Sequence, residues 1–215
     1  MNVTDIIARD LNDAWFQCLA EVMKHGREYT IDKGSYEGSK RKELDFIVAK
    51  ITNPGIRPLR PDTPIGVPVP ATDEDIQNYF VHYLMTEEVA ELEEYTYGQD
   101  ITKQVFEIIE RYNKHGHNTN QLCITVGSSE SLWLEHSQCL RVIDTRILDG
   151  VLNFVVYFRS WDLWAGFPTN LGGLQLLKEY MADEIGVEDG EIIACSKGLH
   201  LYDYAWELAK TIVRI

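Results

Sequence analysis

The sequence lacks several features that would place it in a particular class of protein. It has no run of about 18 apolar residues, so we expect no membrane-spanning helix. Its first residues, MNVTDIIARDLNDAW, contain acids and no apolar stretch of the kind a signal peptide needs. No C-x-x-C pair is present, which leaves little support for a structural zinc site. These absences favour a cytoplasmic protein without a metal.

Positive charge is scarce as well. The chain carries 20 Lys and Arg residues against 34 Asp and Glu residues, which gives a formal net charge of −14. A field of this sign repels phosphates, so we expect neither nucleic acid nor an anionic membrane as a partner. A small anionic substrate would need a local cluster of Arg or Lys side chains.

Cysteine is infrequent and scattered. The four cysteines are Cys18, Cys123, Cys139 and Cys195, and in a cytoplasmic protein we expect them to be reduced. A free cysteine usually behaves as a small buried hydrophobic residue. At most one or two of the four are therefore expected to have a chemical role.

The hydrophobic periodicity predicts an α+β fold. Helices are expected over residues 4–25, 73–95, 101–114, 170–185 and 203–213, and strands near 44–48, 121–127, 138–147, 151–159 and 191–195. A chain of 215 residues is long enough for one large domain with a sizeable core. We therefore expect a single domain spanning residues 1–215, with a mixed, mostly antiparallel sheet flanked by helices.

Proline is nearly confined to one segment. Residues 53–71, NPGIRPLRPDTPIGVPVPA, hold six of the seven prolines. Proline fixes φ and has no backbone N–H, so an extended loop is predicted. The loop is longer than most connections, which favours a functional loop or a flexible flap.

The stretch YFRSWDLWAGFPTN, residues 157–170, combines five aromatic rings with polar groups of different kinds. An Asp-Gly pair at 149–150 predicts a hairpin that brings Cys139 close to Arg159. A neighbouring cation lowers the pKa of a thiol. Arg159 and Ser160 together suit a phosphate group. Asn170 has one acceptor and two donors, which can pair with an amide-like ring edge. The aromatic rings would form a stacking wall or simply core.

Five short motifs give the chain a family resemblance. They are Tyr97-Gly98, Gln138-Cys139-Leu140, the Arg-Ser-x-Asp of residues 159–162, the Gly-x-Pro-x-Asn of residues 166–170 and the His-x-Tyr of residues 200–202. Their order and spacing over about residues 95–205 resemble the thymidylate synthase family, in which the nucleophilic cysteine commonly follows a proline. The absence of long insertions resembles the short archaeal-type branch of that family.

The resemblance implies an activity and its reactants. It implies reductive methylation of dUMP to dTMP, in which Cys139 attacks C6 of uracil and forms a covalent adduct. The one-carbon donor would be methylene-tetrahydrofolate or a methanopterin-type analogue, and no metal is needed. The implied partners are a dUMP-like nucleotide, a reduced pterin and a second copy of the chain in a homodimer.

The resemblance also assigns site residues beyond the nucleophile. The implied nucleotide-binding residues are Lys33, Arg159, Ser160, Asn170, His200 and Tyr202, and the implied pterin contact is Asp162. Lys33, Arg159 and Ser160 would hold the phosphate. Asn170 would bind O4 and N3 of uracil, and His200 and Tyr202 would bind the 3′-hydroxyl of the deoxyribose.

Two departures from the family pattern keep other functions open. Asn120 and Gln121 stand where the family has an Arg pair that binds a phosphate across the dimer. The catalytic Glu of the family is not aligned: Tyr79 occupies the best-matching position, with Glu87 and Glu88 in the neighbourhood. One alternative is a pyrimidine nucleotide hydroxymethylase acting on dCMP, dUMP or CMP, which ends with water instead of hydride. Another is a catalytically inactive nucleotide-binding paralogue.

Overall fold

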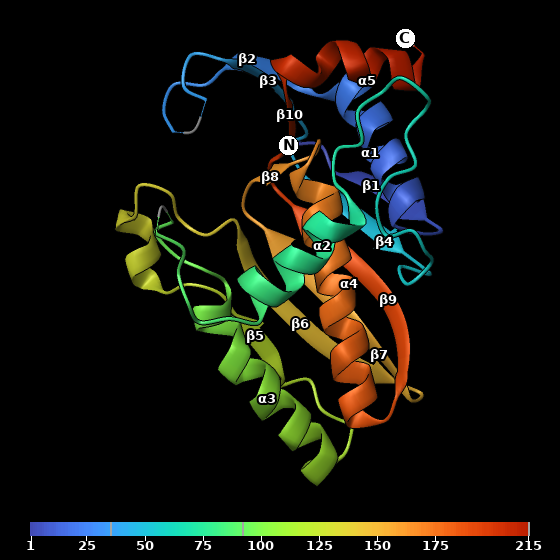
Figure 1. Ribbon diagram of the computed structural model, residues 1–215, viewed down its shortest axis with the longest axis vertical. Helices are drawn as coiled ribbons and strands as arrows, with labels where there is room; N and C mark the ends of the chain where they lie inside the picture. The colour runs from blue at the N-terminus through green and yellow to red at the C-terminus, as the bar shows by residue number, and fades with distance from the viewer. Residues whose placement is uncertain (35, 92, 215) are drawn as a thin grey trace.

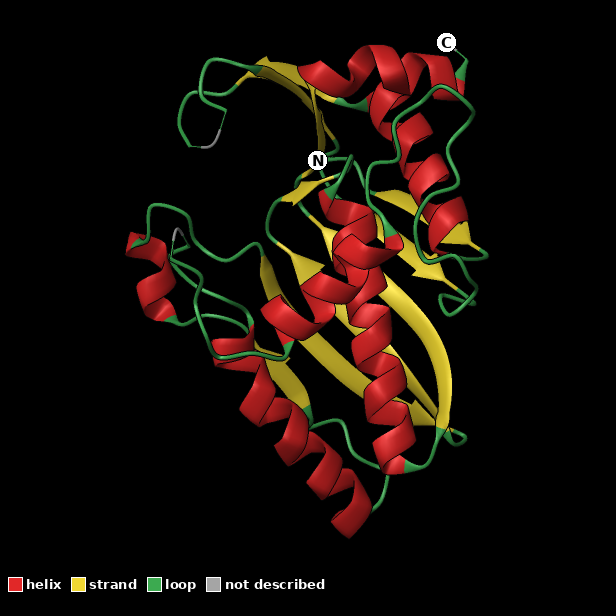
Figure 2. Ribbon diagram, in the orientation of Figure 1, coloured by secondary structure: helices red, strands yellow, loops and turns green. Residues whose placement is uncertain are grey.

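The computed structural model describes residues 1–34, 36–91 and 93–214 and shows two sheets packed with helices (Figures 1 and 2). The larger sheet has the strand order β1-β4-β9-β7-β6-β5, and the smaller sheet has the order β2-β3-β10-β8. Five of the strand pairs are antiparallel and three are parallel. The predicted α+β class with a mixed, mostly antiparallel sheet is confirmed.

The strands of the two sheets come from distant parts of the chain. The larger sheet contains β1 (Thr4–Ala8), β4 (Ile47–Ile51), β9 (Glu188–Ser196), β7 (Val151–Phe158), β6 (Leu140–Leu148) and β5 (Cys123–Thr125). The smaller sheet contains β2 (Arg27–Thr30), β3 (Lys40–Glu43), β10 (Leu199–Tyr202) and β8 (Trp161–Asp162).

Some of the helices run along one face of the larger sheet, and others lie in the upper part of the view in Figure 2. The helices are α1 (Leu11–His25), α2 (Asp73–Tyr79), α3 (Gly98–His115), α4 (Gly166–Ile185) and α5 (Trp206–Val213), with the short turns η1 (Phe80–Leu84), η2 (Ser129–Trp133) and η3 (Asp203–Ala205). Within the described residues, none of these helices combines the length and apolar character that a membrane crossing requires.

Helix α4 lies against the centre of the larger sheet, where it packs on β7 and β9 (Figure 1). Gly172 and Gly173 are the points at which α2 approaches it. A Cβ at Gly172 would meet Ile76 at 2.8 Å, and one at Gly173 would meet the Tyr79 ring at 2.4 Å. Real Cβ atoms do not tolerate such contacts, so the two glycines allow α2 to place Tyr79 directly against α4.

The hairpin of β6 and β7 has the predicted turn at Asp149 and Gly150. Their φ angles of 50° and 80° are both positive, as a type I′ turn requires. The pairing register runs from Leu148 opposite Val151 at the turn to Leu140 opposite Phe158 at the open end. The residue before β6 and the residue after β7 therefore meet at the open end.

The N-terminal helix is shorter than predicted. Residues 4–8 form β1, which pairs in parallel with β4, and α1 begins only at Leu11. Ile6 and Ala8 are buried in alternation along the strand. Asp10 then starts the helix by accepting the N–H of Asp13 at 2.8 Å. The prediction was wrong because five alternating residues were read as part of the longer helical pattern that follows them.

The predicted helix over residues 73–95 also ends early. Helix α2 stops at Tyr79 and is continued only by the π-helical turn η1 to Leu84. The acids that follow are exposed on an irregular segment: Glu87, Glu88, Glu91, Glu93 and Glu94. In the predicted helix they would have gathered at the C-terminal end, where the backbone dipoles disfavour negative charge.

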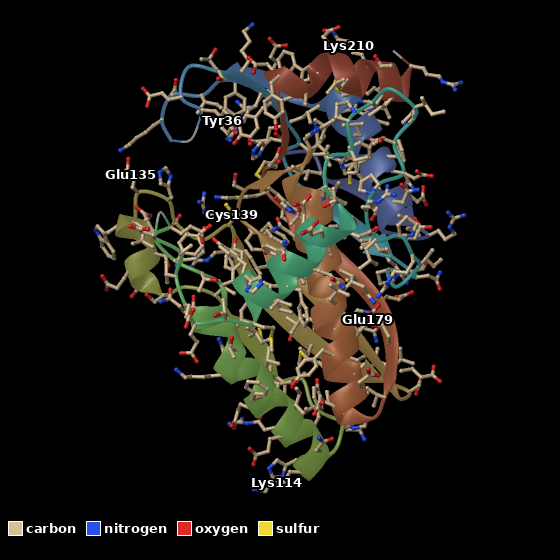
Figure 3. All side chains as sticks on the ribbon, in the orientation of Figure 1. Tyr36, Lys114, Glu135, Cys139, Glu179 and Lys210 are labelled. Atoms are coloured by element: carbon tan, nitrogen blue, oxygen red, sulfur yellow. The ribbon has the colours of Figure 1, made fainter. Side chains whose placement is uncertain are left out.

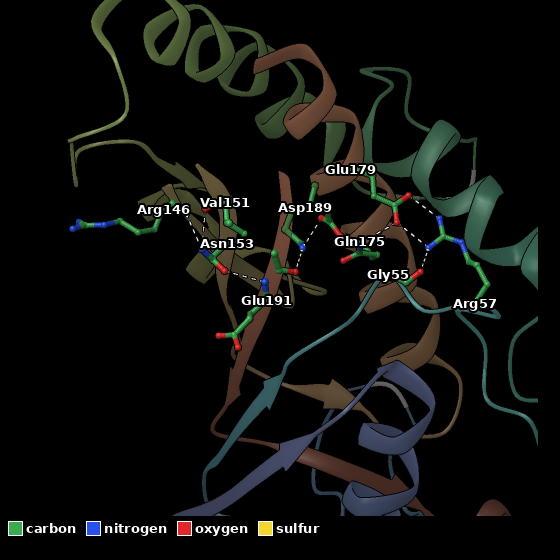
Figure 4. A network of polar contacts seen from close by, with 11 residues as sticks. Gly55, Arg57, Arg146, Val151, Asn153, Gln175, Glu179, Asp189 and Glu191 are labelled. Carbon is green, nitrogen blue, oxygen red and sulfur yellow. Dashed lines mark hydrogen bonds and ion pairs between the residues drawn. The ribbon is translucent and has the colours of Figure 1, made fainter. Parts of the chain in front are cut away.

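The proline-rich segment, residues 53–71, contains no helix or strand, as predicted, and is anchored to the rest of the protein. The guanidinium of Arg57 contacts both carboxylate oxygens of Glu179, at 2.7 and 2.8 Å (Figure 4). The N–H of Asp62 donates to the side chain of Asn12 at 2.8 Å. The segment runs along α1 in Figure 1, away from the position labelled Cys139 in Figure 3. These anchors favour a fixed loop over a flexible flap.

The same polar network reaches a buried cation. The side chain of Lys178 is fully buried and donates to Asp189 at 2.6 Å and to the carbonyl of Gly190. Gln175 links Asp189 to Glu179 (Figure 4). Burial lowers the pKa of Lys178. The network therefore ties α4 both to β9 and to the proline-rich segment.

Candidate active site

The loop that carries Cys139 is held by Arg159. The backbone N–H of Arg159 donates to the carbonyl of Cys139 at 2.8 Å, which extends the hairpin by one step. The guanidinium donates through Nε to the carbonyl of Gln138 at 3.0 Å, and through Nη2 to the carbonyl of Ser137. The structure thus places Cys139 and Arg159 together and makes Arg159 a positioning group for the loop.

The Cys139 thiol is half-buried at the open end of the hairpin (Figure 3). Burial raises its pKa above the ordinary thiol value, and the positive charge of Arg159 acts in the opposite direction. The predicted influence of Arg159 is present, but burial outweighs it in the free protein.

Four tyrosines gather beside Cys139. They are Tyr79, Tyr83, Tyr95 and Tyr97, whose ring centroids lie 5.1 to 6.4 Å apart. Burial raises the pKa of each, and a negative charge on Cys139 raises it further. All four hydroxyls therefore stay protonated at neutral pH. This cluster was not predicted from the sequence, because only the fold brings residues 79–83 against residues 95–97.

Two of these hydroxyls differ in their partners. The Tyr97 hydroxyl accepts the N–H of Leu140 at 3.1 Å and so fixes the residue that follows Cys139. The Tyr79 hydroxyl is buried near the amide of Asn170 and makes no hydrogen bond to the described side chains or backbone. A buried hydroxyl without a partner is costly, so this group is one that a ligand could satisfy.

Asn170 projects from the N-terminal part of α4, and Trp161 holds its amide. The indole N–H of Trp161 donates to Oδ1 of Asn170 at 3.1 Å. The Trp161 ring is 2% exposed and stacks between Phe158 and Phe167, with ring centroids 4.2 and 4.5 Å away. Trp161 is part of the core, which is one of the two roles predicted for the aromatic residues of this stretch, and its indole N–H also holds the Asn170 amide.

Asp162 fixes the start of α4. Its carboxylate accepts the backbone N–H groups of Trp164, Ala165 and Gly166 at 3.3, 3.1 and 2.9 Å. A carboxylate at this position also interacts favourably with the helix dipole. Asp162 therefore positions the helix that carries Asn170, in addition to any contact with a pterin.

His200 lies beside Asp162, because β10 and β8 pair in parallel and bring the two residues into register. Nδ1 of His200 lies 2.8 Å from the carbonyl of Gly198. A carbonyl only accepts, so Nδ1 carries the proton and Nε2 is left as a buried acceptor without a described partner. Burial lowers the pKa of His200, which keeps the ring neutral at pH 7.

The β2–β3 loop reaches the same region. Tyr36 of this loop packs against Tyr202, with ring centroids 4.4 Å apart, and Tyr202 in turn packs edge-on against His200 at 4.8 Å. Lys33 lies on this loop and is exposed. Ser160 is half-buried directly after Arg159.

A further cation of this region was missed in the sequence. Arg41 of β3 pairs in register with Tyr202 of β10 and forms an ion pair with Glu43 at 3.0 Å. Its positive charge contributes to lowering the pKa of His200. The KRKE sequence of β3 resembles a solvated surface, so only the pairing with β10 reveals its position. Within the described ranges, no group of three or more His, Cys, Asp or Glu side chains lies close enough together to hold a metal ion.

The site places the half-buried Cys139 thiol beside the Arg159 guanidinium, and the chain that forms it matches one family of enzymes. A family model described as thymidylate synthase matches residues 81–214. A protein of Methanosarcina acetivorans named "Putative thymidylate synthase" is 30% identical, over 97% of this chain and 94% of its own length. A protein of the same name from Methanothermobacter marburgensis is 24% identical over 98% of both chains. The chain belongs to the thymidylate synthase family.

The structure gives a physical setting for the two departures from the family pattern. Tyr79, at the best match to the catalytic Glu, is the buried phenol beside Asn170, whereas Glu87 pairs with Lys103 at 2.9 Å on the surface. Asn120 and Gln121 are exposed before β5. The register of β5 with β6 places them level with the turn end of the hairpin, opposite the end that carries Cys139.

The raised pKa of Cys139 leads to a pH prediction for the free protein. Only the thiolate is alkylated rapidly, so the rate of iodoacetamide labelling is expected to rise through a midpoint above about 8.5, the ordinary thiol value. Replacement of Arg159 by Gln removes the opposing charge and should move the midpoint still higher. The measurement is peptide mass spectrometry on a Cys123→Ser background, which removes an exposed thiol that would otherwise be labelled as well. A labelling rate that is already constant from pH 6.5 upwards would show that Arg159 outweighs burial.

Proposed function

We propose that the protein is a cytoplasmic thymidylate synthase, in which residues 1–215 form one catalytic domain that converts dUMP to dTMP. The observation that carries the proposal is that Cys139 lies beside Arg159 at the open end of the β6–β7 hairpin, and that Trp161, two residues further on, holds Asn170, in a chain of this family. The one-carbon donor is methylene-tetrahydrofolate or a methanopterin-type analogue.

The phosphate of the nucleotide is assigned to Arg159, Ser160 and Lys33. Arg159 uses its Nε–H and one N–H of Nη2 for the carbonyls of the Cys139 loop, which leaves both N–H groups of Nη1 and the second N–H of Nη2 as donors toward the phosphate. A charge-assisted contact of this kind is about twice as strong as a neutral one. Lys33 on the β2–β3 loop supplies the second cation, in place of the family's Arg pair.

The deoxyribose is assigned to His200 and Tyr202. The buried Nε2 of His200 accepts a hydrogen bond, and the 3′-hydroxyl of the sugar can donate one. This contact would remove the cost of an unsatisfied buried acceptor. Tyr202, packed edge-on against His200, supplies a hydroxyl to the same sugar group.

The chemistry begins when the Cys139 thiol loses its proton and sulfur attacks C6 of uracil. An S–C6 bond forms, and the electron pair of the C5–C6 double bond moves toward C5 and O4, where the Asn170 N–H stabilises the developing charge. C5 would then form a bond to the methylene carbon of the donor, while one of the two carbon–nitrogen bonds of that methylene bridge breaks. Loss of the C5 proton to solvent, cleavage of the remaining carbon–nitrogen bond to the pterin, hydride transfer from the tetrahydropterin and release of Cys139 would give dTMP and a dihydropterin.

The reduced pterin is assigned to Asp162 and to a neighbouring pocket. This pocket has a volume of about 440 Å³ and is lined in part by Tyr79, His82 and Tyr83. Tyr79 connects this pocket to the uracil site, because its ring lines the pocket and its buried hydroxyl lies near Asn170. Tyrosine rings in the wall of a pocket suit a planar ring system.

We propose a homodimer formed through the face of the larger sheet opposite α4. Residues of β7 that point toward α4 are buried, whereas Val155 on the other face is 38% exposed. The same face also carries the polar side chains of Asp144 and Lys50 among other partly or fully exposed apolar ones: Ile7, Val48, Val142, Tyr157, Ile193 and Cys195. A face that exposes this many apolar side chains is typical of a protein interface, and a second copy would cover it by two-fold symmetry.

The direct test is product analysis with purified protein, methylene-tetrahydrofolate or its methanopterin counterpart, and either dUMP or dCMP. We expect dTMP and dihydropterin from dUMP, detected by chromatography with mass spectrometry. A hydroxymethylated nucleotide as the main product would support the hydroxymethylase alternative. Binding of dUMP without any product under either donor would support the inactive paralogue.

A further inference from the structure

The hydrogen bond between Trp161 and Asn170 has a direction that chemistry fixes. An indole N–H donates and cannot accept, so the atom of Asn170 that faces it at 3.1 Å has to be the carbonyl oxygen. The amide NH₂ of Asn170 is then turned away from Trp161. The Trp161 ring is itself immobilised, because it is stacked between Phe158 and Phe167 and is 2% exposed.

Uracil and cytosine require opposite orientations of this amide. Uracil presents the O4 acceptor and the N3–H donor, so it needs the Asn170 NH₂ to donate to O4 and Oδ1 to accept from N3–H. Oδ1 has two lone pairs and can accept from Trp161 and from N3–H together. Cytosine presents an amino group and an unprotonated N3, so it needs the amide turned over. In the turned orientation the Asn170 NH₂ would face the Trp161 N–H, and two buried donors would oppose each other.

The neighbouring hydroxyl does not fix the amide in the same way. Tyr79 lies near Asn170, and its hydroxyl can both donate and accept. It can therefore adapt to either orientation of the amide. The donor-only group is the indole of Trp161.

We propose that Trp161 is a positioning residue that makes the site selective for uracil over cytosine by holding Asn170 in one orientation. The inference rests on the proposed function, because it takes Asn170 as the residue that reads the base. It adds a determinant of specificity that lies behind Asn170 and does not itself touch the nucleotide.

The test is calorimetric titration of the full-length protein with dUMP and with dCMP. Wild type is expected to bind dUMP more tightly. In Trp161→Phe the ratio of the two dissociation constants is expected to narrow by at least about fivefold, mainly through tighter binding of dCMP, since the opposing donor is gone. Trp164→Phe is the matched control: its ring is also buried, but it packs against Trp15, so the ratio should stay as in wild type.

A shape-matched variant covers the case in which Trp161→Phe does not fold. Benzothienylalanine at position 161 keeps the two-ring shape between Phe158 and Phe167 but replaces the N–H by sulfur. It should narrow the ratio as Trp161→Phe does, whereas 5-fluorotryptophan, which keeps the N–H, should preserve it. A loss of packing alone would change both affinities together and leave the ratio intact.

The possible results distinguish a failure of the proposed role of Trp161 from a failure of the proposed function. If wild type prefers dUMP and the benzothienyl variant folds with an unchanged ratio, Trp161 does not set the specificity, and the proposed function stands. If wild type binds dCMP more tightly, or binds neither nucleotide, the proposed function fails and the inference fails with it.

Discussion

Replacement of Cys139 by Ala is expected to reduce kcat by at least about 10⁴-fold, because no other group at the hairpin end can form the bond to C6. The loss should be in kcat, while dUMP binding changes little, since the phosphate, sugar and base contacts are assigned to other residues. Steady-state assays and calorimetry on the same preparation separate the two effects.

The other cysteines provide the controls. Cys18 is fully buried in the core, Cys123 lies on β5 opposite Asp144 in the middle of β6, and Cys195 lies on β9 opposite Tyr157, on the sheet face opposite α4. Replacing any of them by Ala should leave kcat within about threefold of wild type, with Cys18→Ala lowering the free energy of unfolding by about 1 kcal/mol through lost packing. Turnover by Cys139→Ala at a rate near wild type would remove the basis of the proposed mechanism.

Replacement of Arg159 by Lys is expected to weaken dUMP binding by about 30-fold or more and to lower kcat as well. Lysine keeps the charge but loses the planar fork that contacts the carbonyls of Ser137 and Gln138. The loop that carries Cys139 would lose two contacts of about 1 kcal/mol each, in addition to the altered phosphate contact. Both the position of the nucleophile and the phosphate site should suffer.

Comparison of dUMP with deoxyuridine isolates the phosphate part of this effect. Wild type should prefer dUMP strongly, and in Arg159→Lys the preference should shrink. Arg146→Lys, an exposed change on β6 near the turn end of the hairpin, is the control and should match wild type. If wild type binds the two ligands equally, the phosphate is not held by Arg159 and Ser160, and the paralogue alternative gains.

The parts of the site that depend on one hairpin could be predicted from the sequence. The Asp149-Gly150 turn sets the register from Leu148 opposite Val151 to Val142 opposite Tyr157, and a one-residue irregularity between Leu140 and Val142 then brings Cys139 opposite Arg159. The local chemistry of this pair, a thiol beside a guanidinium, follows without knowledge of the rest of the fold. What the sequence could not supply was the extent of burial, which decides that the pKa of Cys139 is raised.

The parts that depend on distant contacts could not be predicted. Tyr79 reaches the site only because Gly173 allows α2 to pack against α4. The residues around Gly173 do not predict this contact, because it joins two helices that are far apart in the sequence. The role proposed for Trp161 depends on its indole N–H alone. The sequence predicts a core or wall position for the ring, but only the fold shows that the N–H donates to Asn170, one helical turn into α4. The strand at residues 4–8 was hidden because its partner β4 lies about forty residues away.

The central claim, that Cys139 forms a covalent bond to C6 of the pyrimidine of dUMP, is tested most directly by mass spectrometry with 5-fluoro-dUMP and a methylene-tetrahydropterin. Fluorine at C5 cannot leave as a proton does, so the adduct should accumulate with nucleotide and pterin both attached. We expect the intact protein to gain the mass of both molecules, with fragment ions placing the adduct on Cys139, and we expect Cys139→Ser to show no gain. An unmodified wild-type protein, or an adduct on Cys123, would contradict the account.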